Sequence, residues 1–410
     1  MPASLHLMRL LVRALHGRSA TRLTRTVQHL AVGSTAAGLS LLLLGSAIVN
    51  GFQWEIPQRM GQFWGHLQVQ SLKSEADPLR RPVRTHPDTL AQWAATEGIR
   101  RIGTVVLLPG LCRSSSGMEG ALLKGCAQPG DLEFFEAHLT EGRSPRWKNP
   151  ATANEVMVPQ SMAQALQLRI GDPLTVHFLL NPVRVRNYVV SGFYDMPMQN
   201  ELGRPVVVVA QAGLAKLLGW SAGYCSHLEI ELEDFRKMDL VRQTLEQDLP
   251  LELECRTLRD LMPALFDWLR FFDTNRWVLL VLLASVGTVN LVSALLILLL
   301  EKQKNLGILQ SLGLRRQALV AVMTYLGLRL VVRGMVLANI LVGILYLTQN
   351  KFHWFVLDPA SYYLDFVPLR LDWTELALTN TGVLLGATLI LLGSTRLMTG
   401  PQTARQLRFS

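Results

Sequence analysis

Three largely apolar stretches of the sequence are each about as long as a bilayer's hydrocarbon core is thick. They run over residues 30–50, 277–300 and 375–395. A helix of roughly 20 residues crosses about 30 Å of hydrocarbon, and a helix satisfies all of its backbone hydrogen bonds internally. The sequence therefore predicts a membrane protein with helical spans.

A fourth stretch, residues 318–348, is long enough to span but carries Arg329 and Arg333. The chain is 49% hydrophobic and 17% charged, too apolar for an ordinary soluble enzyme and too polar for a chain embedded throughout. The predicted fold class is a membrane protein with four transmembrane helices. A large mixed α/β domain, residues 51–276, lies between the first and second helices.

The distribution of basic residues predicts the topology. Residues 1–29 hold five arginines and no acid, and the short 301–317 segment holds four lysines and arginines. By the positive-inside rule both are cytoplasmic, as is the tail 396–410, and residues 51–276 and 349–374 are external. The first stretch follows a basic leader as a signal peptide would. We interpret it as an anchor because no cleavage site follows and helical periodicity continues.

The external segment is predicted to be mixed α/β with no internal repeat. Strand-like runs alternate with helix-like runs along it. The strand-like runs are residues 103–108, 155–158, 174–179, 186–190, 206–210 and 228–232, and the helix-like runs are 161–168, 211–218 and 235–248.

All four cysteines fall in this external segment: Cys112, Cys126, Cys225 and Cys255. Two interpretations stand. In an oxidising compartment the simplest disulfides join Cys112 to Cys126 and Cys225 to Cys255, whereas four free buried thiols are the alternative. No CxxC or HxxxH spacing occurs, so no metal site is predicted.

Motifs of catalysis are absent from the sequence. It has no GxxxxGK[ST] phosphate loop, no GxSxG elbow and no basic patch interleaved with aromatic residues for nucleic acid. We therefore expect a chain that is not an enzyme, binds no cofactor itself and draws its energy from another subunit.

The cytoplasmic segment 301–317 has a short apolar face that Gly313 ends. One interpretation is a helix parallel to the membrane, which a cytoplasmic partner can push. The other is an amphipathic surface turn without such a role.

This segment resembles the "ER..EIGILRALG" signature of FtsX-like (MacB-type, type VII) ABC transporter permeases, in which it is the coupling helix that docks on the ATPase. The resemblance assigns ATPase coupling to Glu301, Lys302, Asn305, Leu306, Ile308, Leu309, Leu312 and Gly313. Family members usually carry an acid at the position of Asn305 and a basic residue at that of Gln310. The tail 401–408 is similar to the family's "P..ALR" ending.

Within that family, IVNGFQWEI at residues 48–56 closely resembles the end of the first span in lipoprotein-release permeases of the LolC and LolE type. Further matches follow in the family's order: Gly142–Arg143, residues 153–172, 189–195 and 357–368. The hairpin around residues 180–185 is shorter than the LolC-type hook that grips the periplasmic carrier.

The resemblance implies a bacterial inner-membrane permease that pairs with an identical or a related permease. Two copies of a cytoplasmic LolD-like ATPase would bind ATP and Mg, and acylated lipoproteins would pass to a LolA-like periplasmic carrier. The alternative function is a mechanotransmitting permease that acts on periplasmic partners or exports another amphiphile. The external domain would have a porter lobe, about residues 51–110 and 195–276, and an inserted lobe, about 111–194.

A lipid cavity is expected where the first span leaves the membrane. Phe52, Ile56, Met60 and Phe63 recur on one helix face, and lifted acyl chains need such an apolar surface. The predicted cavity also includes Ile48, Val49 and Asn50. The alternative for each residue is ordinary packing against protein.

Arg329 and Arg333 lie on one face of the third span, and a charge near the bilayer centre costs at least about 3 kcal/mol. Two interpretations remain open. Either the span begins deeper and both side chains reach the interface, or they bind an anionic lipid or a partner group.

Overall fold

The computed structural model describes residues 22–72, 82–127, 129–149, 152–195, 204–221, 223–272, 316–358, 362 and 364–398, and scattered residues between 277 and 293. The chain forms two compact units. The helical unit comprises Met1–Phe52, Leu269–Phe355 and Val367–Ser410, and the mixed unit comprises Gln53–Trp268 and Val356–Phe366.

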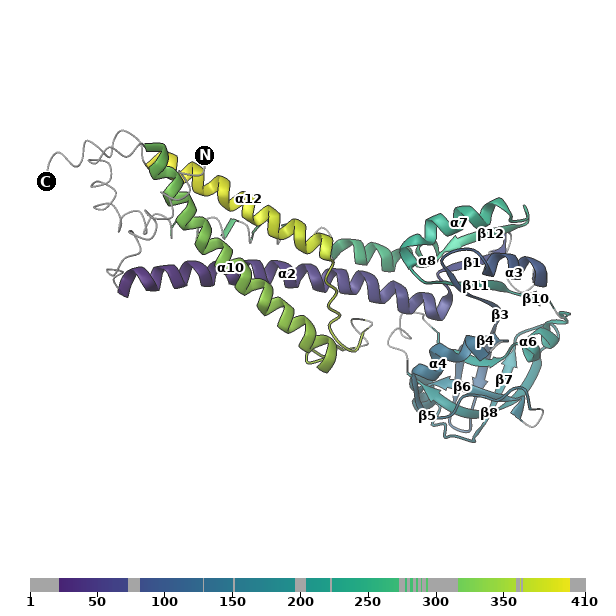
Figure 1. The fold of residues 1–410 in the computed structure, drawn as a ribbon. Coiled ribbons are helices and arrows are strands. Elements are labelled where there is room, and N and C mark those ends of the chain that lie inside the picture. The colour runs from purple at the N-terminus through teal and green to yellow at the C-terminus, as the bar shows by residue number, and fades with distance from the viewer. Residues whose placement is uncertain are drawn as a thin grey trace. The chain divides into compact units, whose positions relative to one another are not determined.

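Three long helices dominate the described part of the helical unit (Figure 1): α2 (Arg22–Trp64), α10 (Arg316–Phe352) and α12 (Trp373–Met398). Their apolar parts Gln28–Trp64, Val320–Phe352 and Trp373–Gly393 are long enough to cross a membrane. Three of the four predicted spans therefore coincide with helices. The other, residues 277–300, lies mostly outside the described residues, so a count of four stays a prediction.

Helix α2 confirms the prediction that the chain stays helical beyond Asn50, because it runs unbroken to Trp64 with Pro57 inside it. Small side chains allow α2 and α10 to approach closely. A Cβ at Gly334 of α10 would lie 2.7 Å from the Cβ of Thr35. Around this contact a buried apolar cluster joins α2 to α10: Ala36, Leu39, Leu43, Ala338 and Val342.

The mixed unit is built on one ten-stranded sheet of order β12-β1-β11-β3-β4-β9-β6-β8-β5, with β7 paired to β3 and β8. Its strands are β1 (Leu67–Ser71), β3 (Ile99–Arg113), β4 (Met118–Cys126), β5 (Leu139–Gly142), β6 (Glu155–Pro159), β7 (Pro173–Phe178), β8 (Arg184–Tyr194), β9 (Val206–Ala210), β11 (His227–Leu232) and β12 (Leu253–Thr257). A separate pair joins β2 (Val83–Arg84) to β10 (Tyr224–Cys225).

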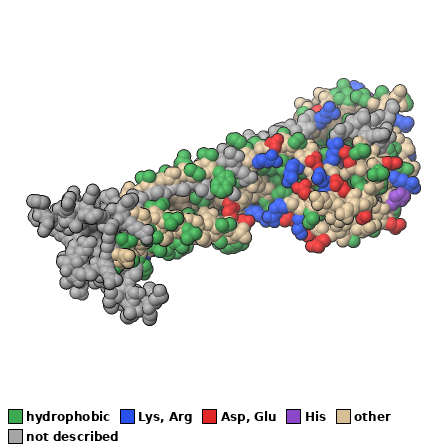
Figure 2. All heavy atoms as spheres, turned by 90° about the horizontal axis from the view of Figure 1, so that it is seen from above, with side chains coloured by type: hydrophobic (Ala, Val, Ile, Leu, Met, Phe, Trp, Pro, Cys, Tyr) green, Lys and Arg blue, Asp and Glu red, His purple; other side chains and the backbone are tan. Residues whose placement is uncertain are grey.

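Short helices accompany this sheet: α3 (Pro87–Ala94), α4 (Glu133–Ala137), α5 (Gln160–Ala165), α6 (Gln211–Leu218), α7 (Met238–Gln247) and α8 (Leu258–Leu261), with 3-10 turns at Pro129–Leu132 and Phe235–Lys237. On the face of the molecule that Figure 2 shows, charged side chains gather mainly over the mixed unit, and hydrophobic side chains are frequent on the helical unit.

All six predicted strands and all three predicted helices overlap elements of the matching type. The strand predictions succeeded on two patterns, since β7 alternates between buried and less buried residues whereas β6, β9 and β11 are runs of buried residues. Strand β3 is shared widely, since it pairs with β11 at its start and with β4 and β7 further along. The division into porter and inserted lobes stays a prediction.

The two candidate disulfides are not formed, because all four cysteines are free and buried. In the β3–β4 register Cys126 lies opposite Val105, and Cys112 is seven residues further along β3. At about 3.4 Å per residue this separation far exceeds the roughly 7 Å between Cα atoms that a disulfide permits. Cys225 and Cys255 belong to strands paired with different partners, Val83 and Val69. Burial raises the pKa of each thiol to about 12.

The family-like motif Gly142–Arg143 makes contacts that stabilise the mixed unit. Gly142 has a φ of +82°, and a Cβ there would lie 2.4 Å from the Ser191 carbonyl oxygen. The adjacent Arg143 forms a bidentate pair with Glu155. Burial raises the pKa of Glu155, but the bonds from Arg143 and from the Arg146 amide lower it further, so it stays below its usual value. These residues therefore have structural roles.

Candidate functional site

Residues Asn50–Phe52 of α2, here called the NGF segment, contact the start of α12 within the helical unit. The Asn50 side-chain amide and the Ser46 hydroxyl both donate hydrogen bonds to the Glu375 carboxylate. Glu375 lies in the first turn of α12, where a negative charge is favoured by the helix dipole. Asp372 precedes this turn and accepts from the Thr374 amide at 2.9 Å. Asn50, predicted to line a lipid cavity, thus has a defined polar partner.

Gly51 permits a close approach of α2 to the chain before α12. A Cβ on Gly51 would lie 2.1 Å from the Pro368 carbonyl oxygen, so only glycine fits. The Arg370 amide donates to the Ala47 carbonyl at 3.0 Å. Next to this contact the Phe52 ring stacks on Phe272, with centroids 5.8 Å apart and planes 8° from parallel. The NGF segment is therefore tightly packed against the rest of the helical unit.

We predict that Gly51→Ala destabilises the helical unit by about 1–3 kcal/mol, since the added methyl must displace backbone. Thermal unfolding of the full-length chain in detergent measures the effect. Gly45→Ala is the matched control on the same helix, because nothing lies within 4 Å of a Cβ there. Equal stability of the two variants would contradict the close approach.

The apolar stripe further along α2 is enclosed by protein. Ile56, Met60 and Phe63 are at most 1% exposed, whereas Ile48 and Val49 are partly exposed. Phe63 is part of an aromatic cluster with Trp64, Phe134 and Phe135, whose ring centroids lie 4.8, 5.4 and 5.4 Å from its own. Ile56, Met60 and Phe63 therefore pack against protein, and the lipid cavity stays a prediction.

A buried lysine holds the C-terminal end of α2 against the sheet. Lys124 is 2% exposed, and its Nζ lies 2.8 Å from Glu229 Oε2. The same ammonium donates to the Phe63 carbonyl oxygen, where a helix C-terminus favours positive charge. It also lies 4.8 Å from the centroid of the Phe63 ring and 5.1 Å from that of Trp64.

Electrostatics keep the Glu229 carboxylate ionised in this interior. Burial raises its pKa, but Lys124 and then His227, whose Nε2 lies 3.2 Å from Oε1, lower it further. The resulting pKa is below the usual value. The stabilisation that this group contributes is present above the unfolded-state pKa and is lost as the pH falls through the folded one.

His66 lies two residues beyond the end of α2 and is fully buried. Its Nδ1 accepts a hydrogen bond from the Leu232 amide at 2.9 Å, and its ring fills the space left by Gly61. Burial lowers the pKa of His66 to about 4, against a smaller rise caused by Asp234. The imidazole is therefore neutral at pH 7.

The chain between α10 and α12 contacts α2 within the mixed unit. Val356 and Phe366 form an isolated β-bridge. Arg59 lies 3.7 Å from Asp365, and its guanidinium carbon lies 6.0 Å from the centroid of the Phe366 ring. The family-like stretch 357–368 therefore includes contacts to the helix that follows the NGF segment.

The coupling residues predicted between Glu301 and Gly313 lie outside the described part of the chain. Arg329 and Arg333 lie on α10 and are exposed. Within the described residues no group of three or more His, Cys, Asp or Glu is placed to hold a metal ion.

Sequence reasoning missed Lys124, Glu229, His66 and Glu375 as members of these contacts. One signal was available for Lys124, which interrupts the apolar run ALLKGC in a strand. Its partner Glu229 is 105 residues away, and no local pattern joins the two.

Comparison with known proteins gives consistent matches. The sequence model of the MacB-like periplasmic core domain matches residues 30–248, more than half of the chain. Lipoprotein-releasing system transmembrane protein LolE of Haemophilus influenzae is 21% identical over 353 residues, covering 81% of this chain and 82% of that protein. LolC of Xylella fastidiosa strain 9a5c is 24% identical over 350 residues, with the same coverages of 81% and 82%.

Among solved structures, the periplasmic region of MacB from Actinobacillus actinomycetemcomitans is 11% identical. It covers 50% of this chain and 94% of its own length, with a TM-score of 0.35.

Proposed function

Because the chain belongs to the family of proteins with a MacB-like periplasmic core domain, we propose that it is the permease subunit of an ABC transporter that releases lipoproteins from the inner membrane. The observation that carries this proposal is the similarity to LolE and LolC over 81% of the chain, which is more than the core-domain match at residues 30–248 covers. ATP would be hydrolysed by a separate cytoplasmic subunit.

We propose that α2 conveys the ATP-driven movement. This helix is continuous from Arg22 to Trp64. Its NGF segment is joined to α12 through Glu375, and its last turn is bonded to Lys124. Both attachments favour movement of α2 as a rigid body over a local rearrangement at its ends. Ile48 and Val49, which are partly exposed, are the residues that would meet acyl chains.

Reconstitution tests this function. The full chain, with its permease partner and ATPase, would be placed in proteoliposomes loaded with an acylated lipoprotein, and a soluble carrier would be added. We expect ATP-dependent transfer of lipoprotein to the carrier. ATP hydrolysis without transfer would refute lipoprotein release and favour a mechanotransmitting permease or export of another amphiphile.

We predict that Leu309→Glu reduces ATP-dependent release by about tenfold or more. A charge on the apolar face of the coupling segment would remove a central contact with the ATPase, and such contacts cost upwards of 1–2 kcal/mol. Gln317→Glu, at an exposed position in the first turn of α10 and away from the apolar face of the segment, is the control and should keep release unchanged. Release and ATPase activity are measured on the same samples. Normal release by Leu309→Glu would show that 301–317 is a surface turn without a coupling role.

A further inference from the structure

Helix α10 presents two positive charges on an exposed face. Arg329 and Arg333 are four residues apart and exposed, with Tyr325 one turn before them and 42% exposed. Within the part of the chain that the structure describes, neither guanidinium has a carboxylate partner. An unpaired arginine on a membrane helix is costly unless an anion or water reaches it.

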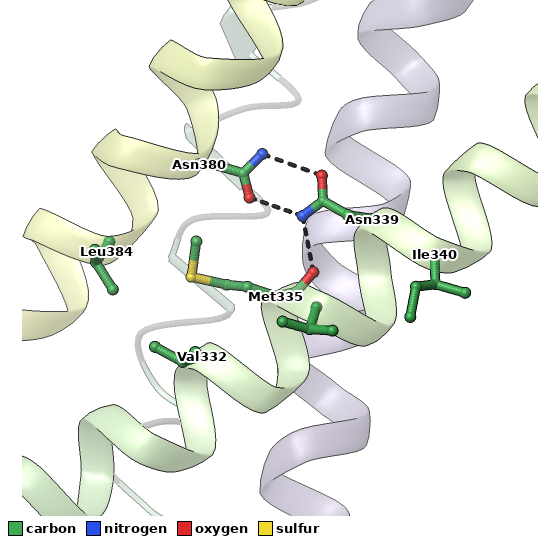
Figure 3. A pocket seen from close by; sticks show the side chains of 7 residues that line it. Val332, Met335, Asn339, Ile340, Asn380 and Leu384 are labelled. Carbon is green, nitrogen blue, oxygen red and sulfur yellow. Dashed lines mark hydrogen bonds between the residues drawn. The ribbon is translucent and has the colours of Figure 1, made fainter.

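A groove between α10 and α12 begins one turn further along the same face. Its volume is about 500 Å³. The lining residues are Val332, Met335, Val336, Asn339, Ile340, Asn380 and Leu384 (Figure 3). Five of these seven side chains are apolar, so the groove suits a hydrocarbon chain.

The two asparagines of the groove satisfy each other. Asn339 Nδ2 donates to Asn380 Oδ1 at 2.9 Å, and Asn380 Nδ2 donates to Asn339 Oδ1 at 3.2 Å. Each amide also donates at 2.8 Å to the carbonyl four residues earlier on its own helix. Their four N–H donors are thus occupied, so the pair joins α10 to α12 and leaves no donor for a ligand.

Helical spacing places the charges and the groove on one side of α10. Residues three and four apart are neighbours on a helix, so Arg329 adjoins Val332, and Arg333 adjoins Val336. An anion held by the two arginines would therefore lie at one end of the groove. A chain attached to that anion could run toward the asparagine pair.

We propose that this face of α10 binds an anionic phospholipid, with the phosphate between Arg329 and Arg333 and an acyl chain in the groove. Charge complementarity identifies the occupant, because two guanidinium groups match a phosphate and the groove supplies an apolar continuation. A second copy of the chain fits less well. A two-fold contact through this face would bring four arginines together, and like charges across an interface are unfavourable.

Lipid retention by the purified full-length chain tests the proposal. The chain is exchanged into detergent with phosphatidylglycerol or phosphatidylcholine of identical acyl chains, and bound lipid is counted by native mass spectrometry. Each arginine near a headgroup favours an anionic lipid by about fivefold, so we expect a preference of about 25-fold. Arg329→Gln/Arg333→Gln should reduce it to about threefold or less.

Two matched controls separate the site from general effects. Arg113→Gln/Lys148→Gln removes the same charge from exposed positions of the mixed unit and should retain the preference. Val336→Trp fills the groove and should reduce retention of both lipids, whereas Leu389→Trp, at an exposed position of α12 outside the groove lining, should not.

Three outcomes would overturn the proposal. The first is equal retention of the two lipids by the unaltered chain, which would leave the arginines to an acidic protein partner. The second is an equal loss in the charge-matched control. The third is displacement of phosphatidylglycerol by millimolar inorganic phosphate, which would identify a free-anion site. None of these readouts depends on lipoprotein release, so failure here and failure of the proposed function are distinguishable.

Discussion

Lys124→Met is expected to lower the free energy of unfolding by about 3–5 kcal/mol, because it leaves the Glu229 carboxylate buried without its cation. The substitution keeps the length and apolar stem of the side chain, so packing changes little. It also removes the donor to the Phe63 carbonyl at the end of α2. Guanidinium unfolding of the full-length chain in detergent, followed by tryptophan fluorescence, measures the loss.

The double variant Lys124→Met/Glu229→Met separates the charge effect from packing. Replacing both members of a buried ion pair by apolar groups is often neutral, so most of the stability should return. Lys216→Met, at an exposed position of α6, is the control and should change stability by less than about 0.5 kcal/mol. A double variant as unstable as the single one would show that Lys124 acts through its contacts with α2 and not through Glu229.

Acidification is expected to destabilise the mixed unit through His66. Its folded-state pKa is about 4 against 6.5 unfolded, so the unfolded state binds more protons between these values. Stability is therefore complete above pH 6.5 and declines as the pH falls toward 4. The expected loss is about 2 kcal/mol at pH 5 and about 3 kcal/mol at pH 4. Burial disfavours the charged ring, and a proton on Nδ1 would also place a donor against the Leu232 amide, which is itself a donor.

His66→Asn tests this cause because the asparagine oxygen can accept from the same amide and does not titrate. Unfolding free energies at pH 7 and pH 5 should then be nearly equal. Glu229 does not confuse the result, because its own contribution is lost only below its unfolded pKa of about 4.5. A variant that still loses about 2 kcal/mol at pH 5 would assign the pH dependence to another group.

Much of the fold follows from local patterns. The helices of residues 30–50, 318–348 and 375–395 were predictable because apolar length is a property of a continuous segment. Strands such as β9 were predictable because an uninterrupted β-branched run favours a buried strand. The resemblance of IVNGFQ to lipoprotein-release permeases could also be recognised from consecutive residues alone.

The site depended on contacts that no local pattern contains. Asn50 and Glu375 are 325 residues apart, and their hydrogen bond depends on the packing of α2 against α12. Cysteine spacing was misleading for the same reason. Cys112 and Cys126 are close in sequence, yet the β3–β4 register carries them to positions seven residues apart along one strand.

The sequence by itself determined which segments are apolar helices, which are strands and which family the motifs resemble, since periodicity, length and motif order are encoded in consecutive residues. Only the tertiary structure decided that the stripe Ile56, Met60 and Phe63 packs against protein. It also decided that Lys124 and His66 lie against the last turns of α2. An apolar face requires some partner, and its pattern is the same whether that partner is lipid or protein. The identity of the partner is fixed by residues that approach from other parts of the chain.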